Sequence, residues 1–141
     1  MEQGVYRYLH RSDYLHVWVD EQLRLMYSEW LRPVSSQEYR AGCLLLASLL
    51  QENGIIYWIA ESSVVSNIIK QDQEWASKTL IPLFAASSVK KIARINASTI
   101  ATYVQEETGP DNTSSIPEGS LEFRQFWSYK EAADWVAGLW I

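Results

Sequence analysis

A capped helix that leads directly into an apolar strand constrains the fold of this chain most strongly. Residues 35–38 read Ser-Ser-Gln-Glu, a capping box in which Ser35 and Glu38 bond reciprocally to each other's amides. Apolar residues then recur at helical spacing up to Asn53-Gly54, which tolerates positive φ, so we expect a helix over about 36–52. The continuous apolar run 55–60 that follows is typical of a strand buried on both faces. A helix between two strands favours a parallel, right-handed crossover.

A β-hairpin is expected before this unit. Residues 14–20 are dense in β-formers, residues 23–30 alternate imperfectly between apolar and polar, and the polar residues between them could turn the chain. Residues 5–9 could add a short edge strand.

Alternating helices and strands are expected after it. Asp72 is expected to cap a helix over about 73–87, and Pro82 to kink or break that helix near Ile81. Further along, the pattern predicts strands over 90–96 and 121–127, a short helix over 99–107 and a final helix that a second capping box opens at Ser128 and that runs to about Leu139. The whole chain, 1–141, is therefore predicted to be a single α/β domain with a mixed sheet. Residues 108–120, rich in Pro, Gly, Ser and Thr, are expected to form its mobile internal loop.

Charge and composition narrow the classes of partner and location. The net charge of −5 and the pI near 5.0 argue against nucleic acid and against an anionic membrane surface. The longest apolar run, 41–50, is far short of the ~20 residues that a membrane span requires, and the N-terminus has no signal-peptide pattern, so we expect a cytoplasmic protein. The single cysteine, Cys43, lies in that run and is expected in the core. Seven Trp and eight Tyr indicate a ring-rich core, or an aromatic-lined pocket or partner surface.

The sequence contains no recognised catalytic, cofactor-binding or metal-binding motif. None of the six glycines has the spacing of a phosphate-binding loop. The two histidines, His10 and His16, are six residues apart; a joint site on one strand face is weighed against a simpler interpretation as solvated strand residues. We therefore expect no cofactor and no enzymatic activity, although an enzyme with an unrecognised site stays open.

One segment invites a functional interpretation. Glu61, Ser62 and Ser63 follow the central strand, in the region where open α/β sheets commonly place their sites. Amides at a following helix start could hold an anion or a phosphoryl group. The alternative is an ordinary polar turn with a serine cap.

Residues 14–136 resemble the SpoIIAA-like branch of the STAS superfamily, the anti-sigma-factor antagonist fold. The resemblance depends on several patterns: the opening hairpin, the helix start at 35–39, the segment 72–75 that leads to the Pro82 helix, the strand 89–93 and the closing segment 126–135. It implies a small mixed sheet flanked by helices, with cytoplasmic protein–protein regulation or small-ligand binding rather than catalysis.

The same resemblance implies a phosphorylation site. STAS antagonists carry a phosphorylatable serine in an Asp-Ser-x-Gly turn after a central strand, and Ser62 could occupy that position. Glu61 stands where the family has Asp, and Val64 where it has Gly.

Two functions from different classes follow. The leading hypothesis is a non-enzymatic, STAS-like interaction or regulatory module, as in bacterial signalling, with an unidentified protein partner. The alternative is a carrier or sensor of a small apolar or lipid-like ligand in an aromatic-lined cleft.

The apolar C-terminus suggests self-association. Trp135, Trp140 and Ile141 need cover, either from the chain's own sheet or from a second copy in a two-fold homodimer. They are the predicted dimer contacts.

Overall fold

One mixed sheet organises the part of the chain that the computed structural model describes, residues 6–65, 68–96 and 121–138. Its six strands lie side by side in chain order: β1 (Tyr6–Arg11), β2 (Leu15–Asp20), β3 (Leu25–Trp30), β4 (Tyr57–Glu61), β5 (Lys91–Ile95) and β6 (Glu122–Phe126). The pairs β1–β2 and β2–β3 are antiparallel, and β3 to β6 run parallel. The predicted single α/β domain with an opening hairpin and a mixed sheet is confirmed.

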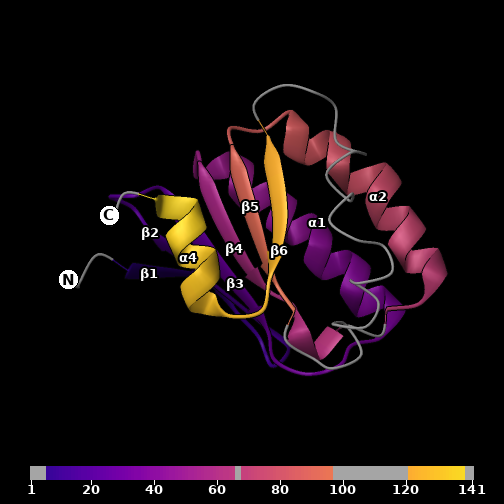
Figure 1. Cartoon of the computed structure of the whole chain (residues 1–141). Helices are drawn as coiled ribbons and strands as arrows, with labels where there is room; N and C mark the ends of the chain where they lie inside the picture. Colours follow the sequence, from indigo (N-terminus) through magenta and orange to yellow (C-terminus); the bar gives the residue numbers. More distant parts are fainter. Residues whose placement is uncertain (1–5, 66–67, 97–120, 139–141) are drawn as a thin grey trace.

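Helices cover both sides of the sheet. α1 (Ser36–Glu52) and α2 (Lys70–Ala85) lie together on one side, and α4 (Tyr129–Ala137) lies on the other (Figure 1). A short 3-10 helix, η1 (Ser63–Val65), follows β4. The helix expected over 99–107 and the loop expected over 108–120 lie outside the described residues.

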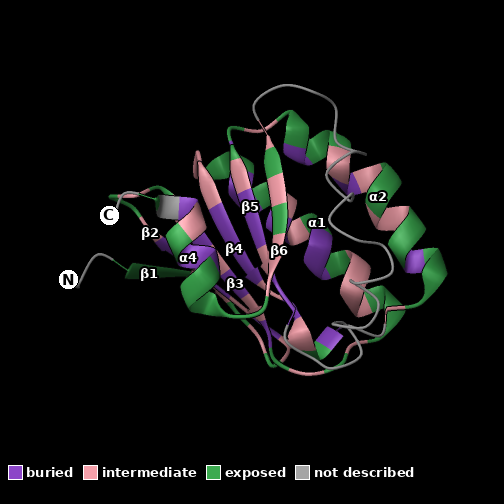
Figure 2. Ribbon diagram, viewed as in Figure 1, coloured by how far each residue is buried: buried purple, intermediate pink, exposed green. Residues whose placement is uncertain are grey.

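Alternation along the strands divides the core into two layers. Trp58 and Ile92 belong to the layer under α1 and α2, whereas their neighbours Ile59 and Ala93 pack against α4. The strands β4 and β5 are accordingly buried on both faces, and the outer faces of the helices are exposed (Figure 2).

The first helix forms as its local sequence predicts. Ser35 Oγ accepts a hydrogen bond from the Glu38 amide at 3.1 Å, and Glu38 Oε1 accepts one from the Ser35 amide at 3.0 Å. The helix ends before Asn53, and Gly54 adopts a φ of +57°. The predicted bounds and capping box are confirmed.

The second helix corrects the role assigned to Asp72. Ile69 is the N-cap, and Asp72 lies inside the first turn, 2% exposed. Its carboxylate accepts hydrogen bonds from Ser36 Oγ at 2.8 Å and from Arg40 Nε at 2.9 Å, both on α1. Burial acts to raise the pKa of Asp72, but these two hydrogen bonds outweigh it and hold the pKa below its ordinary value. Asp72 therefore links α2 to α1 through its carboxylate and does not cap its own helix.

Of the kink or break predicted near Ile81, the break is wrong. α2 continues through Pro82 to Ala85, and the Pro82 carbonyl accepts the Ala86 amide at 3.0 Å. Pro82 lies in the last turns of the helix and is exposed, so its missing N–H removes one hydrogen bond where water can reach the backbone.

Candidate functional site

Half of one sheet face carries a patch of aromatic side chains. On this side α4 contacts mainly β4, β5 and β6, so β1, β2 and β3 present their side chains beyond it. Strand register places Tyr6, Asp20 and Leu25 side by side in one cross-strand row. It places Tyr8, Trp18 and Tyr27 in the next.

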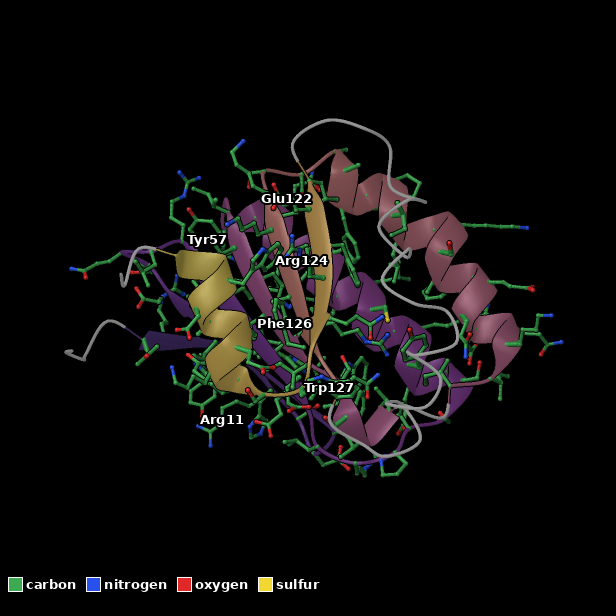
Figure 3. The ribbon with its side chains drawn as sticks, viewed as in Figure 1. Arg11, Tyr57, Glu122, Arg124, Phe126 and Trp127 are labelled. Atoms are coloured by element: carbon green, nitrogen blue, oxygen red, sulfur yellow. The ribbon has the colours of Figure 1, made fainter. Side chains whose placement is uncertain are left out.

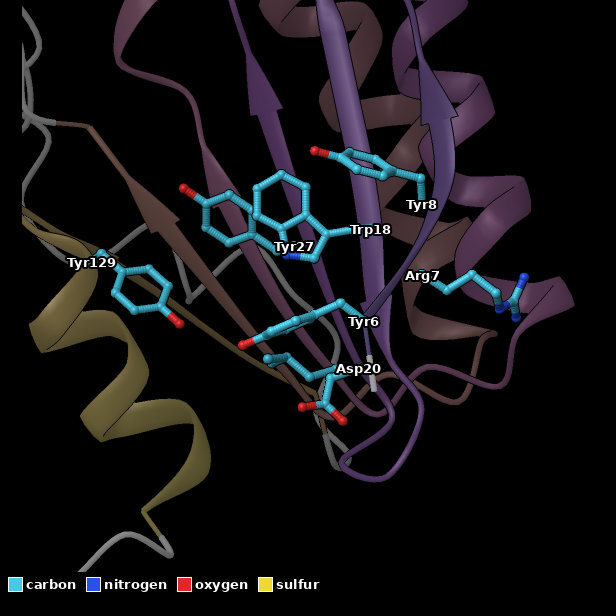
Figure 4. Close-up of a pocket in the computed structure, with 8 residues that line it drawn as sticks. Tyr6, Arg7, Tyr8, Trp18, Asp20, Tyr27 and Tyr129 are labelled. Carbon is cyan, nitrogen blue, oxygen red and sulfur yellow. The ribbon is translucent and has the colours of Figure 1, made fainter. Parts of the chain in front are cut away.

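These rows and the start of α4 line an open groove of about 470 Å³, which we call the aromatic groove (Figure 4). Trp18 and Tyr27 are half-buried, whereas Tyr6, Tyr8 and Tyr129 are 62%, 49% and 50% exposed. The complete lining comprises Tyr6, Arg7, Tyr8, Trp18, Asp20, Leu25, Tyr27 and Tyr129. Four elements, β1, β2, β3 and α4, therefore contribute to one site.

Ring contacts connect the groove from strand to helix. The ring centroids of Tyr8 and Trp18 are 5.7 Å apart, and those of Trp18 and Tyr27 are 4.4 Å apart. Tyr27 in turn meets Tyr129 edge-to-face at 5.7 Å. Such pairs contribute about 0.5–1.5 kcal/mol beyond the area they bury, so they hold the rings in place.

Charged groups at the groove have different roles. Arg7 is turned outward, where its Nε donates to Glu21 Oε2 at 2.8 Å (Figure 4). Asp20 Oδ1 accepts hydrogen bonds from the amides of Gln22 and Leu23, at 3.0 and 3.2 Å. These bonds fix the Asp20 carboxylate at the edge of the aromatic rings.

Two tyrosine hydroxyls of the groove stay protonated well above neutral pH. Burial raises the pKa of Tyr27, and the charges of Glu29 and Glu61 raise it further. Burial also raises the pKa of Tyr129, with added contributions from Tyr6 and Asp20. Both phenols can therefore donate a hydrogen bond to a ligand.

The predicted segment 61–63 joins β4 to η1: Glu61 is the last residue of the strand, and Ser63 is the first residue of the 3-10 helix. Glu61 Oε1 accepts the Ser63 amide at 2.8 Å, so a side chain of the turn itself already binds this amide. Ser62 is 6% exposed; its amide donates to the Ile95 carbonyl at 2.9 Å, and its carbonyl accepts the Val65 amide at 3.1 Å. The structure brings the three predicted residues together. Their polar groups bond to one another and to neighbouring backbone, as in an ordinary polar turn.

Trp135 lies against the chain's own sheet. It is half-buried, and its ring is 5.5 Å from that of Phe126. Lys91 Nζ and Arg124 Cζ lie 5.0 and 5.3 Å from its ring centroid; Arg124 and Phe126 both belong to β6 (Figure 3). Trp140 and Ile141 lie outside the described residues, so the homodimer stays a prediction.

The two histidines do not share a face. His10 pairs with Val17, whereas His16 pairs with Arg11, because a bulge interrupts the register between Tyr8 and His10. Val17 packs in the layer under α1 and α2, and His16 meets the Tyr8 ring on the opposite side. Within the described ranges no cluster of three or more His, Cys, Asp or Glu is arranged to hold a metal ion.

The sequence suggested an aromatic-lined cleft as an alternative, but it did not identify the residues of the aromatic groove. The available signal was the two-residue spacing of Tyr6 and Tyr8, and of Trp18 and Asp20. It indicates that each pair shares a strand face. The register that aligns the two pairs, and the place of Tyr129 beside them, depend on tertiary structure.

The chain matched no family model, no curated protein and no solved structure in the three comparisons. The helices of the described segments are all too short or too polar to cross a membrane.

Proposed function

We propose that this protein binds a small, largely apolar ligand in the aromatic groove, as a carrier or sensor that performs no chemistry on it. The observation that carries the proposal is the groove itself, about 470 Å³ in volume and lined by five aromatic rings. Small-molecule sites are typically concave, mostly apolar and roughly 300–1,000 Å³ in volume, with a few polar groups that orient the ligand.

The arrangement of the rings favours binding of a flat or chain-like apolar group. Trp18 and Tyr27 form a half-buried floor, and the more exposed Tyr6 and Tyr129 stand at its sides (Figure 4). A ligand on this floor would remove ring surface from water, at about 25 cal/mol for each Å² of apolar area buried. The phenol of Tyr129 and the carboxylate of Asp20 supply polar contacts at the edge.

Titration with the neutral fluorescent probe Nile red tests this function. We expect saturable binding to the wild type and at least about tenfold weaker binding to Trp18→Ala and to Tyr8→Ala, since each loses a ring of the groove. Trp127→Ala is the matched control, because Trp127 is 43% exposed and does not line the groove.

Circular dichroism of each variant verifies folding. Tyr8→Ala is the substitution that disturbs the core least, because Tyr8 is half-exposed on the edge strand. Equal loss of binding in the Trp127→Ala control, or wild-type binding in both groove variants, would contradict the proposed site.

A second candidate is a STAS-like, non-enzymatic regulatory module that binds a protein partner. It is favoured by a mixed sheet with helices on both sides and by the segment Glu61-Ser62-Ser63 at the end of the central strand β4. Incubation with a kinase-bearing lysate of the source cell tests it. Phosphate incorporation that Ser62→Ala abolishes and Ser63→Ala preserves would support this module, and incorporation unaffected by Ser62→Ala would count against it.

A further inference from the structure

The aromatic groove is electronegative for two separate reasons. The faces of tyrosine and tryptophan rings carry negative potential, and several such rings converge here. In addition, the Asp20 carboxylate lies in the same cross-strand row as Tyr6 and Leu25, at one end of the groove (Figure 4).

The two neighbouring arginines each have a partner already, and neither contacts Asp20. Arg7 is paired with Glu21 and turned outward. Arg11 lies with its guanidinium carbon 4.4 Å from the centroid of the Tyr8 ring and is not part of the groove lining. The contact between Arg11 and Tyr8 is itself a cation–π interaction, so at this one ring Arg11 offsets part of the negative potential.

The field of the acidic residues extends over the groove. Burial raises the pKa of Tyr129, and Tyr6 and the negative charge of Asp20 raise it further. Glu29 and Glu61 act in the same direction on Tyr27 at the floor, where burial is again the larger cause. Of these acidic residues Asp20 belongs to the groove lining, so a cation in the groove would be attracted by its carboxylate.

We propose that the ligand of the aromatic groove is an organic cation, a quaternary ammonium compound whose methylated nitrogen lies against the tyrosine and tryptophan rings beside Asp20. This proposal rests on the ligand-binding function proposed above and names its chemical class. Quaternary nitrogen has no N–H to donate, so ring faces and one carboxylate are sufficient to stabilise it.

The occupant is a free small molecule. The groove volume of about 470 Å³ lies within the small-molecule range, and the groove continues past Asp20 along Trp18 and Tyr8. The ammonium group would lie against the rings of Tyr6 and Trp18 beside Asp20, and the remainder of the molecule would extend toward Tyr8.

Calorimetric titration with choline and with its uncharged carbon isostere, dimethylbutanol, tests the charge directly. The two probes share a shape and differ in the charge of one atom. We expect the wild type to bind choline at least about tenfold more tightly than the isostere.

Two variants assign this preference to the groove. Asp20→Asn keeps an oxygen acceptor for the turn amides and should reduce the choline affinity about tenfold, while leaving the isostere affinity unchanged. Glu52→Gln is the matched control: it removes the same charge from the exposed end of α1, on the other side of the sheet, and should bind choline as the wild type does.

The outcomes separate the two proposals. Equal affinity for choline and its isostere overturns the cation proposal but leaves ligand binding intact, provided that Nile red still binds in a Trp18-dependent way. Choline binding that Asp20→Asn does not weaken also overturns it, as does absence of choline binding at millimolar concentration. Tighter binding of a trimethyllysine peptide than of choline would overturn the assignment to a free small molecule.

Discussion

A single methyl group added at Gly42 should destabilise this protein, although alanine is the better helix former. Gly42 lies inside α1, and a Cβ atom there would stand 2.5 Å from Trp30 Cη2 and 3.1 Å from Trp30 Cζ3. The indole of Trp30 has little room to move. It is 5% exposed, and Tyr14 and Tyr39 stack against it with ring centroids at 6.1 and 5.8 Å.

Two opposing contributions decide whether Gly42→Ala raises or lowers the free energy of unfolding. Replacing glycine by alanine in a helix interior gains about 0.5–1 kcal/mol. Overpacking a filled core costs about 1–3 kcal/mol. We therefore expect a net loss of about 1 kcal/mol in the free energy of unfolding, which lowers Tm by about 2–4 °C in a chain of this size.

Chemical denaturation of four variants isolates the cause: Gly42→Ala, Trp30→Leu, the double variant and Ser48→Ala. In a Trp30→Leu background the clash is absent, so Gly42→Ala should raise the free energy of unfolding by about 0.5–1 kcal/mol. Ser48→Ala, at an exposed position of the same helix, should change it by less than about 0.5 kcal/mol. If Gly42→Ala stabilises the wild type as much as it stabilises the Trp30→Leu variant, the clash argument is refuted.

Four further outcomes are expected. Ser35→Ala should lower the free energy of unfolding in urea by about 0.5–2 kcal/mol, whereas Ser35→Asp, which keeps an acceptor for the Glu38 amide, should stay near wild type. Equal urea midpoints for the wild type and both variants would show that the Ser35 cap does not stabilise the helix. Ser28→Ala should cost about 1–3 kcal/mol because it leaves the buried Trp58 indole N–H, now 2.9 Å from Ser28 Oγ, without its acceptor; a loss under half a kcal/mol would contradict this. Burial raises the pKa of Cys43 to about 12, so above about pH 9 only the unfolded thiol ionises and the free energy of unfolding should fall as pH rises, less steeply in Cys43→Ala; parallel curves for the two proteins would refute it. If Trp135 is a dimer contact, Trp135→Ala should shift light scattering from dimer to monomer without unfolding; a wild type that is monomeric at high micromolar concentration would rule out the dimer.

The sequence alone predicted those features whose hydrogen bonds close within a few residues. The limits of α1 follow from Ser35, Glu38 and Gly54, each acting on backbone nearby. The burial of β4 on both faces follows from its continuous apolar run, because only a strand covered on both sides accommodates such a run. Alternation and element order together then predicted a mixed α/β sheet, which the structure has.

Only the tertiary structure decided the features that join distant segments. Asp72 has the local appearance of a helix cap, but Ser36 and Arg40, more than thirty residues earlier, bind its carboxylate. The bulge in β1 separates His10 from His16, although their even spacing suggested a common face.

The aromatic groove illustrates the same limit at the candidate site. The pattern of β2 predicts that Trp18 and Asp20 share a face, but not whether that face is covered. The groove exists because register aligns Tyr6 with Asp20 and because α4 packs over the other half of the sheet, which places Tyr129 at the boundary. Register and helix placement depend on the packing of the whole core, so no local stretch of sequence contains them.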